Sequence, residues 1–166
     1  MTRDRSPTDP AENPVPPVPP LNRMVIAVLG LVGFFVALYL FVWYVGWMGD
    51  IVCGVGNCSA VQASPYAWVG PVPVPALGMA GYLLLTTVAV VGLQPGLRRS
   101  RTVSGLLLAL SGMGLGYSAW LTWIEAFVIH AWCQWCVFSA VIMVSIFLAS
   151  LPEIRRWRRS SLRGPP

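Results

Sequence analysis

Four long and almost uncharged runs limit the kind of fold that this chain can adopt. They cover about residues 24–48, 73–93, 103–129 and 133–151. Each is long enough to cross a hydrocarbon core of ~30 Å as a helix that rises ~1.5 Å per residue. Only 10% of the 166 residues are charged, whereas a soluble globular domain has about 25%. We therefore expect an all-α integral membrane protein, a four-transmembrane-helix bundle with an extracytoplasmic loop and half-helix lid.

The positions of the arginines predict the orientation of this bundle. With four spans, both chain ends and the turn at residues 94–102 lie on one side, and that side carries all 11 basic residues. The opposite side, residues 49–72 and 127–132, has none. Because cytoplasmic loops are rich in arginine and lysine, we expect a multi-pass protein of the bacterial cytoplasmic membrane with both termini in the cytoplasm. This orientation explains the net charge of +5 without a nucleic-acid partner.

The segments outside the four spans are expected to be tails. Residues 1–23 are rich in proline, which favours disorder or polyproline II. Residues 24–151 would form the single membrane domain. We expect the fourth helix to end at Pro152, so that residues 152–166 form a basic cytoplasmic tail.

The four cysteines all fall on the extracytoplasmic side of the predicted bundle. Cys133 and Cys136 form a Cys-x-x-Cys motif at the head of the fourth run. This spacing places both sulfurs on one face of a first helical turn, where free N–H groups and the helix dipole favour a thiolate. Cys53 and Cys58 lie in the one long loop. In bacteria that compartment is oxidising, which favours disulfide chemistry.

Three uses of these cysteines are compatible with the spacing: redox exchange, structural disulfides, or a four-cysteine metal site. Haem attachment is excluded because Val137 follows Cys136 where a histidine is required. A structural bridge from Cys133 to Cys136 would close so short a loop that it would hardly constrain the unfolded chain. We favour redox exchange, with a four-cysteine metal-binding membrane protein as the alternative.

A disulfide relay needs a final electron acceptor. Oxidation of a dithiol releases two electrons and two protons, and the chain carries no haem, flavin or dinucleotide motif. A membrane-soluble quinone accepts both. We therefore expect quinone as the acceptor, and no metal, haem or flavin.

Several stretches resemble the vitamin K epoxide reductase (VKOR) family in its bacterial form, over about residues 24–151. The order of the cysteines is the distinctive part, because the loop pair comes first and the Cys-x-x-Cys heads the fourth span. The similar stretches are Cys58-Ser59-Ala60-Val61, Ser64-Pro65-Tyr66-Ala67, the series Pro73, Gly78 and Tyr82, and Tyr117…Leu121-Thr122-Trp123-Ile124-Glu125…Ala131-Trp132-Cys133-Gln134-Trp135-Cys136.

The resemblance implies a function and a role for each cysteine. Such proteins reoxidise a secreted thioredoxin-fold (DsbA-like) oxidase and pass the electrons to a membrane quinone, either menaquinone or ubiquinone. By position, Cys53 would be attacked by the partner's thiolate. Cys58 would exchange with Cys133, and Cys136 would face the quinone. The chain would be a stand-alone form without a fused thioredoxin domain, so the partner would act in trans.

Five residues are candidates for the quinone pocket. Some relatives carry a tyrosine four residues after the second active cysteine, where this chain has Ala140 with Ser139 beside it. Ordinary packing or an interfacial position is the alternative for the aromatic candidates. The candidates are Tyr82, Tyr117, Trp135, Phe138 and Ser139.

Two titratable residues near the active pair each have two interpretations. Glu125 lies near the outer end of the third span, and it either manages protons for the thiols or reaches interfacial water. His130 is three residues before Cys133, and it either stabilises a thiolate or is an ordinary interfacial histidine.

Overall fold

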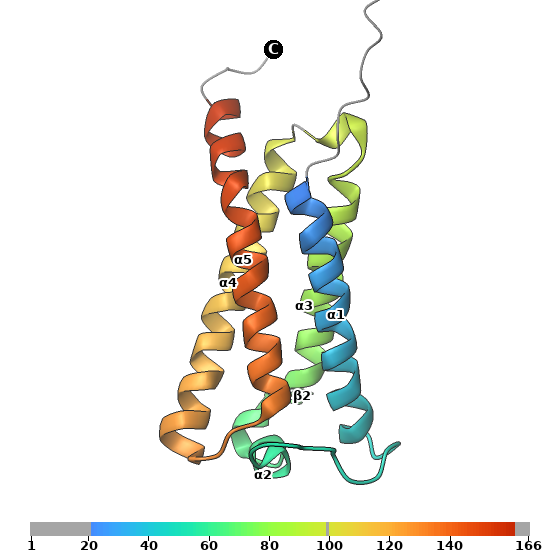
Figure 1. Ribbon diagram of the computed structural model, residues 1–166, viewed down its shortest axis with the longest axis vertical. Coiled ribbons are helices and arrows are strands. Elements are labelled where there is room, and N and C mark those ends of the chain that lie inside the picture. Colours follow the sequence, from blue (N-terminus) through green and yellow to red (C-terminus); the bar gives the residue numbers. More distant parts are fainter. Residues whose placement is uncertain (1–20, 99, 162–166) are drawn as a thin grey trace, which may run out of the picture.

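Four long helices form the bundle. The computed structural model describes residues 21–98 and 100–161, so most of the expected N-terminal tail lies outside the described residues. Within these residues, four helices are long and apolar enough to cross a membrane. They are α1 (Leu21–Tyr44), α3 (Val74–Val91), α4 (Arg101–Ile124) and α5 (Gln134–Ser161). Figure 1 shows them side by side, with the short helix α2 (Cys58–Gln62) at one end. The predicted four-helix membrane bundle is confirmed.

The helices of the bundle pack closely except between α3 and α4. Helix α1 packs along α3 and α5, and α4 packs along α5, whereas α3 and α4 touch each other less. Small residues let α1 approach α3, since a Cβ at Gly33 would lie 2.4 Å from the Tyr82 ring. The core between the helices is apolar and includes Ile26, Leu107 and Ile146.

The long loop folds into short elements over one end of the bundle. After α2 come a 3-10 turn at Pro65–Ala67 and the paired strands β1 (Trp68–Val69) and β2 (Val72–Pro73). The α-helix in this loop is the short α2, whose Val61 is buried against the cysteines. Trp68 lies in β1.

Helix α4 ends in a turn that is wider than a turn of an α-helix. A π-helical turn covers Glu125–Ile129, and His130 then takes a left-handed conformation with φ of 54°. The backbone N–H of Ala131 donates to the Glu125 carbonyl. This turn reverses the chain so that α5 starts beside the end of α4.

The predicted ends of the first and last spans were wrong. Helix α1 already begins at Leu21, and α5 continues through Pro152 to Ser161. A buried ion pair explains both differences: the Arg23 and Glu153 side chains are fully buried and lie 2.8 Å apart. Because Glu153 directly follows Pro152, this pair holds the next helical turn against α1, although proline removes one helical hydrogen bond.

The same ion pair connects all four long helices. The Arg23 guanidinium also donates to the Gly92 carbonyl at the end of α3 (2.6 Å) and to the Ser104 hydroxyl on α4 (3.2 Å). Asn22 donates a further hydrogen bond to Glu153. With both charges hydrogen-bonded, this end of the bundle can bury them.

Candidate active site

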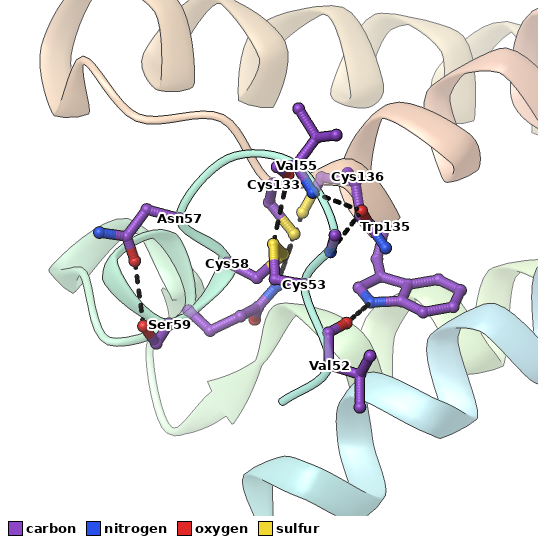
Figure 2. Close-up of a disulfide and its surroundings, with 12 residues drawn as sticks. Val52, Cys53, Val55, Asn57, Cys58, Ser59, Cys133, Trp135 and Cys136 are labelled. Atoms are coloured by element: carbon purple, nitrogen blue, oxygen red, sulfur yellow. Dashed lines mark hydrogen bonds between the residues drawn. A yellow bond between two sulfur atoms is a disulfide. The ribbon is translucent and has the colours of Figure 1, made fainter. Parts of the chain in front are cut away.

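The two cysteine pairs meet at the end of the bundle that carries α2. Cys53 and Cys58 form a disulfide, whereas Cys133 and Cys136 are free thiols. Cys58 is 1% exposed and Cys133 0% exposed, and they belong to one buried cluster. Figure 2 shows the disulfide sulfurs beside the sulfurs of the helix pair. The loop disulfide is therefore placed for exchange with the thiols of α5.

A strap formed by residues 52–57 holds the disulfide in this place. It runs across the start of α5, and hydrogen bonds fasten it at three points along its length. These bonds join the Val52 carbonyl to the Trp135 indole N–H (2.9 Å), the Gly54 and Val55 N–H groups to the Gln134 side-chain oxygen (2.9 and 3.0 Å), and the Asn57 N–H to the Trp132 carbonyl (2.8 Å). The strap corresponds to the expected lid.

Glycine at position 56 lets the strap come this close. Gly56 pairs with Cys133 as an isolated antiparallel bridge, and its φ is +91°. A Cβ there would lie 2.2 Å from the Trp132 carbonyl oxygen. Any larger residue would therefore be strained and would collide with the chain just before the active pair.

Helix α2 brings a second group to the thiols. Its N-cap is Asn57, whose side chain accepts the Ala60 N–H. At the other end of α2, Gln62 is buried and its amide donates to the Cys136 sulfur at 3.5 Å. No sequence pattern points to Gln62, because a glutamine in an apolar loop is also an ordinary surface residue.

The position of Cys133 favours its thiolate. Cys133 immediately precedes α5, and its carbonyl accepts the Val137 N–H of the first turn. The hydrogen bond from the Cys136 thiol is the main cause that lowers the pKa of Cys133 to about 7. Burial opposes this effect. The lowered pKa makes the Cys133 thiolate more accessible at neutral pH than that of an ordinary cysteine.

A cavity of about 310 Å³ begins at Cys136 and extends between the helices. Its volume is at the lower end of the range of small-molecule sites. Most of its lining is apolar and comes from all four long helices. Three of the predicted pocket residues line it, namely Tyr82, Tyr117 and Ser139. The Tyr82 hydroxyl lies 2.8 Å from the Ser139 hydroxyl, which provides a polar point inside the cavity.

The other two predicted pocket residues do not line the cavity. Trp135 turns towards the strap and towards α1, where its ring lies 4.7 Å from the ring of Tyr39. Phe138 is 54% exposed on the outer face of α5. Helical spacing explains why Ser139 lines the cavity and Trp135 and Phe138 do not. Cys136 and Ser139 are three residues apart and therefore share the inward face of α5.

Glu125 and His130, the two titratable residues near the active pair, lie in different surroundings. Glu125 is buried, lines the cavity, and accepts the Cys133 N–H at 3.2 Å. His130 is exposed, and its ring nitrogen lies 3.3 Å from the Val128 carbonyl. The structure thus brings Glu125, but not His130, to the active pair.

The alternative of a metal site gains no support from this arrangement. The disulfide uses two of the four sulfurs that such a site would need. Among the described residues, no group of three or more histidine, cysteine, aspartate or glutamate side chains is placed to hold a metal ion.

The family of the chain follows from its sequence match as well as from this geometry. No curated protein matches the chain at a significant level. The model of the vitamin K epoxide reductase family matches residues 24–151, which cover the four spans and both cysteine pairs. The match supports a membrane thiol oxidoreductase with a disulfide among its cysteines. The chain belongs to the vitamin K epoxide reductase family.

Proposed function

We propose that this protein reoxidises a secreted thioredoxin-fold oxidase and passes the electrons to a membrane quinone. The proposal rests on one observation: the loop disulfide, the two helix thiols and the cavity are neighbours in that order. The loop disulfide lies against Cys133, the free Cys133 and Cys136 thiols are hydrogen-bonded to each other, and Cys136 lines a cavity within the bundle. Electrons can thus move from the outer surface to the bundle interior by two thiol–disulfide exchanges.

The first step involves Cys53. Cys53 is less buried than Cys58, and the strap exposes apolar side chains on both sides of it, with Val52 69% and Val55 77% exposed. The partner's thiolate attacks the Cys53 sulfur and breaks the Cys53–Cys58 bond. The resulting mixed disulfide is then resolved by the partner's second cysteine, so that the partner leaves oxidised and the loop pair is reduced.

The second step moves the electrons to α5. The Cys58 thiolate attacks Cys133 in an oxidised Cys133–Cys136 pair, and Cys136 leaves as a thiolate. Cys53 then attacks Cys58, which re-forms the loop disulfide and releases Cys133. The low pKa of Cys133, about 7, makes it a good leaving group. The observed state, with an oxidised loop pair and a reduced helix pair, is the one that follows this step.

The cavity suits the final acceptor. A bound quinone would accept two electrons and two protons from the helix pair. The apolar lining fits a flat ring, and the Tyr82 and Ser139 hydroxyls offer hydrogen bonds to its oxygens. Tyr82 on α3 thus supplies a hydroxyl although Ala140 replaces the tyrosine that some relatives have on α5.

The proposed location is the bacterial cytoplasmic membrane. Helices α1 and α4 begin at the bundle end opposite α2 (Figure 1). Arg23 lies in the first turn of α1, Arg98 follows the turn at Pro95–Leu97, and Arg101 starts α4. With the positive-inside rule, that end would face the cytoplasm, and both cysteine pairs would face the oxidising side.

A quinone-reduction assay tests this function. Purified protein would be mixed with a reduced thioredoxin-fold oxidase and a soluble menaquinone or ubiquinone analogue, and quinone absorbance followed. Turnover is expected for the parent and for Ser59→Ala, which removes an exposed hydroxyl next to Cys58. It should be lost in Cys53→Ala, Cys133→Ala and Cys136→Ala. A parent that reduces no quinone, with all four cysteines reduced and metal bound, would contradict the proposal.

A further inference from the structure

A buried acid lies where the helix pair meets the cavity. Glu125 is 4% exposed, although its neighbours in the cavity are mainly apolar. It begins the π-helical turn at the end of α4, and single π turns are frequent at functional sites. Burial of a carboxyl group is unfavourable unless hydrogen bonds compensate. The position of Glu125 therefore requires an explanation.

The carboxyl group lies next to the reacting thiols. One oxygen accepts the Cys133 N–H at 3.2 Å. The Cys136 thiol can donate its one proton either to the Cys133 sulfur or to this carboxyl group, while the Gln62 amide donates to the Cys136 sulfur at 3.5 Å. Glu125 is thus an acceptor for the Cys136 proton once the Cys133 thiolate no longer holds it, and Gln62 donates to the same sulfur.

The other titratable groups in the cavity are poor proton carriers. Among the described residues that line it, these are Cys136, Tyr82 and Tyr117. Phenols have a pKa of about 10, so the tyrosines keep their protons at neutral pH. His130 is exposed and bonds to the Val128 carbonyl. Among the described residues that line the cavity, Glu125 is the one with a carboxyl group.

We propose that Glu125 carries the Cys136 proton to the quinone, an inference that rests on the function proposed above. When the pair is oxidised, the Cys133–Cys136 bond forms and the Cys136 S–H bond breaks. Glu125 takes that proton and gives it to a reduced quinone oxygen. The quinone needs a second proton, and Cys133 cannot supply it because Cys133 is already a thiolate. This proton enters from the water outside. Two electrons leave the sulfurs, and two protons accompany them.

Three variants test this role. Glu125→Gln keeps the size and an oxygen for the Cys133 N–H but carries no proton. We expect it to slow quinone-dependent oxidation of the helix pair by about 100-fold, within the usual range for general acid–base catalysis. Glu125→Asp should retain most of the rate. In Glu125→Ala, added acetate or formate should restore part of it.

Two further readouts separate proton transfer from a structural role. Exchange with the reduced oxidase, measured in a single turnover without quinone, should stay within about two-fold of the parent in Glu125→Gln. The infrared S–H band of Cys136, assigned by its loss in Cys136→Ser, should shift in Glu125→Gln because its acceptor has changed.

The outcomes distinguish the two proposals. A parent that reduces quinone beside an equally fast Glu125→Gln overturns the role of Glu125 alone. If Glu125→Gln loses exchange, quinone reduction and thermal stability to the same extent, the role of Glu125 in proton transfer is also overturned, because such losses indicate a structural residue. A parent that reduces no quinone overturns the function itself, whatever the infrared band shows.

Discussion

Gly56 and Cys133 pair across an antiparallel bridge, which places the loop backbone against the residue that starts the reactive helix. The neighbouring Asn57 N–H donates to the Trp132 carbonyl at 2.8 Å. The disulfide at Cys58 is therefore positioned by backbone contacts and not only by the packing of its sulfurs. The strap of residues 52–57 is thus part of the candidate active site.

Gly56→Ala should detach the strap. Its φ of +91° and the 2.2 Å approach of a Cβ to the Trp132 oxygen make alanine both strained and obstructed. Gly46→Ala is a matched control, because its φ is +79° but no atom lies within 4 Å of its Cβ. We expect faster hydrogen exchange in residues 52–57 and slower internal exchange in Gly56→Ala only. Equal effects of both changes would show that backbone strain, and not the bridge, is responsible.

The Cys133 thiol should titrate about two pH units below an ordinary thiol. The Cys136 hydrogen bond lowers its pKa to about 7, so the thiolate is present above pH 7 and disappears as the pH falls through 7. In a variant without the loop cysteines, ultraviolet absorbance of the thiolate should show this midpoint. Adding Cys136→Ala should raise it. A midpoint near 9 before that change would contradict the account.

Tyr82→Phe should weaken quinone binding without affecting exchange between the cysteine pairs. It removes one hydroxyl, which lies 2.8 Å from the Ser139 hydroxyl. A net hydrogen bond is worth about 1 kcal/mol, so the KM for quinone should rise by about five-fold. Tyr66→Phe is the control, because Tyr66 is an exposed loop residue. An unchanged KM in steady-state assays would exclude a hydrogen bond from Tyr82 to quinone.

Glu153→Gln should destabilise the bundle strongly. It leaves the Arg23 cation buried without its charge partner, which typically costs about 3–5 kcal/mol and would lower the unfolding midpoint by about 10 °C. Replacing both with apolar residues, Arg23→Met with Glu153→Leu, should cost less. Thermal unfolding in detergent measures both, with the exposed Arg101→Gln as control. A Glu153→Gln midpoint equal to that of Arg101→Gln would refute the role of the ion pair.

Sequence patterns predicted the parts of this protein that depend on local composition. The length of each apolar run predicts the four spans, and the spacing of Cys133 and Cys136 predicts two thiols at a helix start. The start of α5 at Gln134 confirms this placement. Such signals are readable because a membrane span and a helix terminus are each set by neighbouring residues.

Contacts between segments that are distant in the chain could not be predicted from local sequence patterns. Trp135 resembles a pocket residue in sequence, but its indole N–H is used to hold the Val52 carbonyl. Arg23 resembles one more cytoplasmic arginine, and Pro152 resembles a helix end. Their true roles depend on Glu153 meeting Arg23 across the bundle, which is a property of helix packing and not of local pattern.

The central claim is that electrons pass between Cys58 and Cys133, and trapping their mixed disulfide tests it most directly. In the Cys53→Ala/Cys136→Ala variant, neither partner cysteine can resolve that bond, so mild oxidation should join Cys58 to Cys133 in most molecules. Non-reducing peptide mass spectrometry would identify the bond. The matched variant Cys58→Ala/Cys136→Ala should form little of a Cys53–Cys133 bond. Free Cys58 and Cys133 thiols after oxidation, or equal bonding in the matched variant, would contradict the account.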